Sequence, residues 1–75
     1  MPSLIIELWL LVRTHRMLTL AERQYLRAAF EARDDLALAD EFTASAKRYA
    51  ARADWLRAEY ETRRAAAHRF EGQAA

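Results

Sequence analysis

Residues 42–70 read FTASAKRYAARADWLRAEYETRRAAAHRF, and the spacing of apolar side chains in this stretch decides the fold. These side chains recur at alternating steps of four and three, which is the repeat of a helix that packs lengthwise against another helix. Arg63 interrupts the resulting seam, which is otherwise formed by Phe42, Ala46, Tyr49, Ala53, Leu56, Tyr60, Ala67 and Phe70. Small residues at alternate positions let two helix axes approach closely. The pattern predicts a long, coiled-coil-like C-terminal helix over residues 36–70.

The absence of helix breakers extends the helical prediction to almost the whole chain. No proline or glycine lies between residues 3 and 71, and these two residue types interrupt helices most strongly. The pair Asp34-Asp35 is the plausible interior break, because either carboxylate could cap a helix that begins at Leu36. Aspartate is only mildly unfavourable within a helix, so one continuous helix over residues 20–70 is the alternative.

The N-terminal segment 4–12 is apolar at every position except Glu7, so a short helix over residues 4–16 would be apolar on all sides. Such a helix is buried or associated with a membrane. The segment is much shorter than the roughly 20 residues that span a bilayer, and it has the wrong flanks for a signal peptide. It is a core helix enclosed by its own fold or oligomer, an anchor in a larger partner's groove, or a helix on a membrane surface. We expect its contacts at Leu4, Ile5, Leu8, Trp9, Leu11 and Val12.

A second helix is predicted over residues 20–33. Thr19 and Glu22 have the spacing of a capping box, in which each side chain bonds the other's backbone N–H. This pattern places a turn at 17–19. The helix that follows is amphipathic, and its apolar face includes Tyr25, Leu26, Ala29 and Phe30.

Size and composition indicate a partner. The chain has 75 residues and no cysteine, and a chain this short is marginally stable unless a metal, disulfides or association supports it. We expect one all-α domain over residues 1–75, a small helical bundle with a frayed tail at 71–75. The two shorter helices would cover only part of the long one, so another chain is expected to cover the rest of its seam. Trp55 lies off the seam and suggests a second contact surface.

The side chains offer little chemistry for catalysis. Ser3 and Ser45 are the only serines, cysteine is absent, and the single glycine is Gly72, which excludes a glycine-rich phosphate loop. We therefore predict no catalytic residue, no bound cofactor and no metal ligand. The net charge is +1, and the arginines of the C-terminal half point around the helix instead of forming one basic face, which argues against nucleic-acid binding.

The sequence predicts a non-enzymatic interaction or structural protein of the cytoplasm: an accessory subunit, an assembly factor or a small inhibitor. It would act through the seam and the apolar N-terminal helix, on another protein or as a homo-oligomer. One alternative is a DNA-binding regulator, since residues 18–43 faintly resemble a helix-turn-helix without the usual glycine in the turn. The other is a peripheral membrane protein anchored by residues 4–12.

Overall fold

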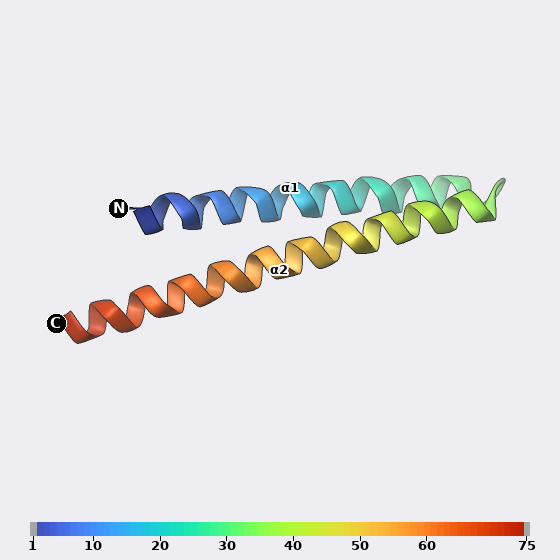
Figure 1. Ribbon diagram of the computed structural model, residues 1–75. Coiled ribbons are helices and arrows are strands. Elements are labelled where there is room, and N and C mark those ends of the chain that lie inside the picture. Colours follow the sequence, from blue (N-terminus) through green and yellow to red (C-terminus); the bar gives the residue numbers. More distant parts are fainter. Residues whose placement is uncertain (1, 75) are drawn as a thin grey trace.

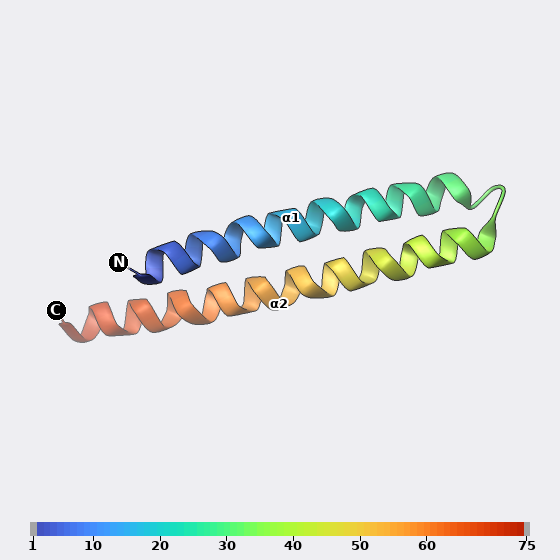
Figure 2. The same ribbon diagram turned by 45° about the horizontal axis from the view of Figure 1, so that its top comes forward.

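The computed structural model describes the backbone of residues 2–74 and the side chains of residues 4–69. Within this part of the chain, helix α1 (Pro2–Glu31) is joined by a short turn to helix α2 (Leu36–Ala74). The helices run antiparallel, so the beginning of α1 and the end of α2 lie at the same end of the hairpin, opposite the turn (Figures 1 and 2). The hairpin measures 61 × 15 × 12 Å. The predicted all-α class is confirmed, but the architecture is a helical hairpin instead of a bundle of three helices.

The first two predicted helices form one continuous helix, α1, of 30 residues. The prediction of a turn at 17–19, with Thr19 as a helix cap, is wrong. The hydroxyl of Thr19 donates a hydrogen bond to the carbonyl oxygen of His15, one turn earlier in the same helix, at 3.0 Å. Threonine inside a helix commonly bonds in this way. With no glycine or proline nearby to stop the helix, a local capping pattern did not suffice to end it.

The predicted break at Asp34-Asp35 is confirmed, which excludes a continuous helix over residues 20–70. The N–H groups of both aspartates donate to the carbonyl oxygen of Glu31, at 3.1 Å and 2.8 Å, and these bonds close the end of α1. Oδ1 of Asp35 then accepts a hydrogen bond from the N–H of Leu38 at 3.0 Å. Asp35 is therefore the N-cap of α2, since its side chain satisfies a backbone donor that the helix itself leaves free.

Helix α2 begins at Leu36 as predicted and continues to Ala74, so residues 71–74 belong to the helix instead of a frayed tail. Two predicted features fall outside the described part of the chain: residue 75 of that tail and the side chain of Phe70 in the seam.

The seam of α2 packs against α1 of the same chain. Leu56 and Ala46 are completely buried, and Phe42, Tyr49 and Tyr60 are half-buried. The expectation that the seam lacks an intrachain partner of comparable length is wrong. A continuous helix of 30 residues is about 45 Å long at 1.5 Å per residue, which is enough to cover most of α2.

The face of α1 that meets α2 is composed mostly of small and polar residues. Its buried positions recur at steps of three, four and seven, and they are Glu7, Leu10, Thr14, Ala21 and Ala28. On the facing side, Leu56 is the largest fully buried side chain in the described part of the chain. Burying a leucine contributes about 1.5–3 kcal/mol, and an alanine contributes much less. The hairpin therefore has a thin core for its length.

Candidate interaction surface

The N-terminal segment 4–12 has the reverse of the burial that its composition suggests. Its single charged residue, Glu7, is only 6% exposed, whereas most of its apolar side chains face solvent. All of the contact residues predicted here are exposed, namely Leu4, Ile5, Leu8, Trp9, Leu11 and Val12. Leu10 is the apolar residue of the segment that packs on α2. The chain's own fold therefore does not enclose this segment, and an oligomer, a larger partner or a membrane surface remains.

The exposed apolar surface continues along most of α1 in two columns of residues spaced by seven. One column consists of Leu4, Leu11, Leu18 and Tyr25, and the other of Ile5, Val12 and Leu26, with Thr19 in the gap. Leu8 lies between the columns, four residues after Leu4 and three after Ile5, which is the spacing of neighbours on a helix surface. We call the surface formed by these apolar residues the outer face of α1: Leu4, Ile5, Leu8, Leu11, Val12, Leu18, Tyr25 and Leu26.

Sequence reasoning missed three of the eight residues of the outer face as contacts, namely Leu18, Tyr25 and Leu26. Tyr25 and Leu26 were assigned to the apolar face of an ordinary amphipathic helix, but Leu26 is 71% exposed, and Leu18 was not singled out. The predicted turn at 17–19 separated these residues from Leu11. The seven-residue spacing from Leu4 through Tyr25 was the available signal, and it becomes visible once α1 is continuous.

The outer face is large for a chain of this size. A half-exposed leucine or tyrosine presents roughly 100 Å² of side-chain surface, so the outer face offers on the order of 800 Å². The largest apolar patch on a typical monomer is about 300–600 Å², and larger ones mark interaction sites. Among the side chains that the structure describes, the exposed large apolar ones outside α1 are Leu36 and Trp55. The apolar surface is therefore concentrated on one helix.

Glu7 is held by an ion pair across the two helices. Its Oε2 lies 3.7 Å from Nη1 of Arg64, whose side chain is 44% exposed. Nη2 of Arg64 also lies 3.3 Å from Nε2 of His68 in the next turn of α2. Because the Glu7 carboxylate is nearly buried, the ion pair compensates part of the cost of removing it from water. The pair links the inward side of α1 to α2.

An arginine guanidinium lies over the ring of each of two exposed tryptophans. The guanidinium carbon of Arg13 lies 5.2 Å from the ring centroid of Trp9, and that of Arg52 lies 4.8 Å from the ring centroid of Trp55. Both distances are in the range of a cation–π contact. Nε of Arg13 is buried without a hydrogen-bond partner in the structure. Trp55 lies on α2, away from the outer face, where we predicted a second contact surface, and it is 54% exposed.

The predicted interface residues of the seam are already occupied within the hairpin. Ala46, Ala53 and Leu56 are buried, and the aromatic residues Phe42, Tyr49 and Tyr60 are half-buried. Phe42 also lies under the guanidinium of Arg27 from α1, with the carbon 5.3 Å from the ring centroid. These residues therefore pack α2 against α1 within the hairpin.

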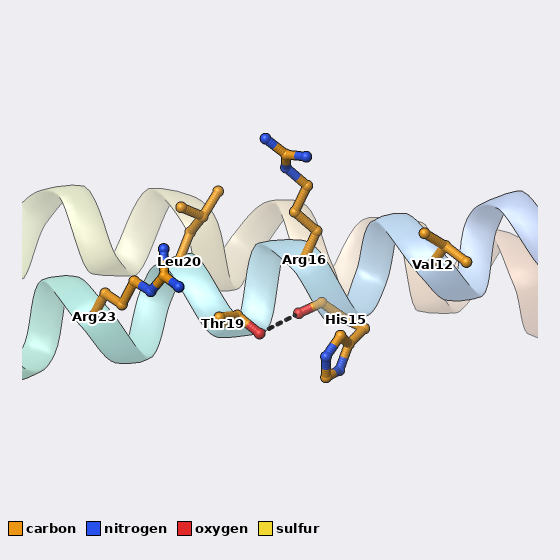
Figure 3. Close-up of a pocket in the computed structure, with 6 residues that line it drawn as sticks. All are labelled: Val12, His15, Arg16, Thr19, Leu20 and Arg23. Carbon is orange, nitrogen blue, oxygen red and sulfur yellow. Dashed lines mark hydrogen bonds between the residues drawn. The ribbon is translucent and has the colours of Figure 1, made fainter.

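A shallow groove of about 480 Å³ runs along α1 beside the outer face. Figure 3 shows that its lining residues all come from this one helix and that their side chains diverge, with Arg16 pointing to one side and His15 to the other. The hydroxyl of Thr19 bonds the His15 carbonyl, so it is engaged with the backbone. Catalytic sites bring a nucleophile and a base into hydrogen-bond contact, and the six residues lining this groove hold no such pair: Val12, His15, Arg16, Thr19, Leu20 and Arg23.

No protein-family model, curated protein or solved structure matches the chain significantly. Within the described residues, neither helix combines the length and the apolar character that a bilayer crossing requires. The outer face of α1 is therefore the feature on which a functional argument rests.

Proposed function

We propose that this chain is a non-enzymatic interaction protein, an accessory or structural subunit, that binds a protein partner through the outer face of α1. One observation carries the proposal: the hairpin packs mostly alanines and polar residues inside, while most leucines of α1 face solvent. An isolated monomer would gain stability from the opposite arrangement, because burial of apolar surface is the dominant favourable term in folding. A partner that covers the outer face would bury this apolar surface on association and so supply the favourable free energy that folding alone does not gain from it.

This proposal changes the surface that the sequence indicated. The sequence favoured contacts through the seam and through residues 4–12, whereas the seam is occupied by α1. The interface we propose keeps the N-terminal leucines and adds Leu18, Tyr25 and Leu26. The cytoplasmic location remains a prediction.

The test uses two variants with the same added charge. Leu11→Glu with Leu18→Glu places two carboxylates seven residues apart on the outer face. Ala51→Glu with Ala58→Glu places two carboxylates seven residues apart on α2, at exposed alanines. Each purified chain is immobilised and exposed to extract of the native host, and retained proteins are identified by mass spectrometry.

We expect at least one protein to bind the wild type and the α2 control but not the outer-face variant, and to do so again after purification. If the two variants retain the same proteins, and neither differs from the wild type in self-association, the proposal is wrong.

A membrane surface is the second candidate. It is favoured by the exposed Trp9, which follows the exposed apolar Leu4 and Leu8 in the sequence, and by the exposed, basic Arg16 further along the same helix. Helices that lie on membranes combine an apolar face with flanking cations in this way. The outer face, however, continues through Leu26, well beyond the apolar segment 4–12, which favours a partner that follows the whole helix.

A further inference from the structure

We propose that the partner of the outer face is a second copy of this chain, packed antiparallel along α1 so that two hairpins form a four-helix assembly. This inference rests on the proposed function, because it names what the outer face binds.

The spacing of the outer face fits a helix as its partner. Leu4, Leu11, Leu18 and Tyr25 recur at intervals of seven, and a straight helix drifts by about 20° per heptad relative to such a repeat. From Leu4 to Tyr25 this drift adds up to about 60°, and a gentle winding of α1 around another helix would remove it. From Leu4 to Tyr25 the column is about 32 Å long. Its partner must be a helix of comparable length, and α1 is one.

Two polar residues between the apolar columns of the outer face favour one direction of packing. His15 and Glu22 are exposed and continue the line of Leu8 at intervals of seven, between the two apolar columns. In a parallel pair of α1 helices, His15 would face His15 and Glu22 would face Glu22. In an antiparallel pair whose two-fold axis lies between residues 18 and 19, His15 of each copy faces Glu22 of the other. The antiparallel pair therefore matches a hydrogen-bond donor with a carboxylate twice.

The same register matches five of the eight apolar residues, and Leu4 falls opposite Arg33, beyond the end of α1 at Glu31. Counting outward from an axis between residues 18 and 19, Leu11 faces Leu26 of the second copy, and Val12 faces Tyr25. Leu8 faces Ala29, an exposed small residue that leaves room for it. Because the interface is two-fold symmetric, each of these contacts occurs twice.

The area of the outer face is large enough for a stable dimer interface. A standard protein–protein interface buries about 800 Å² on each partner, and the outer face offers apolar surface on the order of 800 Å² by the area of its side chains. Association through α1 would also place further large apolar side chains in the interior of the assembly, and the alanine-rich core of one hairpin holds few of them.

Single cysteines test the direction and the register. The chain has no cysteine, so an introduced one reports only on contact between copies. Leu18→Cys lies next to the proposed axis and should form a disulfide-linked dimer on mild oxidation at micromolar concentration, since the two Cα atoms come within bonding range. Leu8→Cys lies far from the axis and should not link to itself. A mixture of Leu8→Cys and Ala29→Cys should form the mixed dimer.

Sedimentation measurements test independently whether a second copy of the chain binds the outer face. We expect the wild type and the Ala51→Glu/Ala58→Glu control to be dimers at micromolar concentration. The Leu11→Glu/Leu18→Glu variant should keep its helical circular dichroism and raise the dimer dissociation constant about 100-fold or more.

A wild-type monomer at all accessible concentrations would overturn the inference, as would equal self-linking of Leu8→Cys and Leu18→Cys, which indicates parallel chains. If the monomer still captures a host protein through the outer face, the inference fails and the proposed function stands. If the outer-face variant also behaves like the control in capture, both fail.

Discussion

Replacing Leu56 with alanine measures how much of the hairpin's stability depends on one side chain. Leu56 is 0% exposed. The other fully buried seam residues on its helix, Ala46 and Ala53, have much smaller side chains. A buried leucine-to-alanine change costs about 2–5 kcal/mol, from the lost transfer free energy and the cavity left behind. At about 0.05–0.15 kcal/mol per residue, a 75-residue chain has roughly 4–11 kcal/mol in total. Two rod-like helices can close part of the cavity, so we expect a loss of about 3 kcal/mol.

Urea denaturation followed by far-UV circular dichroism measures this loss. With a slope near 1.5 kcal/mol/M, a loss of about 3 kcal/mol lowers the unfolding midpoint by about 2 M. Leu36→Ala is the matched control, because Leu36 lies on the same helix and is 68% exposed, so its loss should stay within about 0.5 kcal/mol. Repeating both titrations over a range of protein concentrations separates folding from association. Equal midpoints for the two variants would show that the assigned core is wrong.

Three further outcomes are expected. Asp35→Ala removes the cap that accepts the Leu38 N–H and should lower the free energy of unfolding by about 1 kcal/mol, whereas Asp35→Asn should retain most of it; a loss as large for asparagine as for alanine would contradict the cap. Arg64→Ala leaves the buried Glu7 carboxylate without its partner at 3.7 Å. Because the arginine is half-exposed, we expect the free energy of unfolding to fall by only about 1–2 kcal/mol, whereas Glu7→Leu should be neutral or stabilising. Urea titrations that show equal losses of stability for the two variants would refute this account. In a Trp55→Phe background, Trp9 should have the fluorescence emission of a solvent-exposed indole, since Trp9 is 52% exposed. Liposomes containing anionic lipid should leave this emission unchanged. A shift of the emission to the blue on adding liposomes would favour binding to a membrane surface instead.

The helical class and the turn were accessible from the residues alone. A chain without proline or glycine between residues 3 and 71 has no local reason to leave the helix except at Asp34-Asp35, where a carboxylate competes for backbone donors. The seam of α2 was equally accessible as far as Tyr60, because large and small apolar residues alternate there at helical spacing. These features depend on short-range geometry, which sequence spacing records directly.

The false prediction of a turn at 17–19 had a local cause. Thr19 and Glu22 satisfy the capping pattern, but the threonine hydroxyl can bond the carbonyl of His15 equally well inside a helix, and it does so at 3.0 Å. A sequence pattern cannot distinguish these two partners. The false turn then hid the length of α1, and with it the intrachain partner of the seam.

Sequence by itself determined that the chain is helical, where it turns, and which face of α2 packs inward, because each follows from neighbours within a few residues. Only the tertiary structure decided which side of α1 faces α2. The segment 4–12 is apolar almost all round, so its periodicity favours no orientation. The choice was made by contacts distant in sequence: the short residues Ala21 and Ala28 allow close approach to α2, and Glu7 reaches Arg64 across the hairpin. The leucines of α1 consequently face outward, where another chain can cover them.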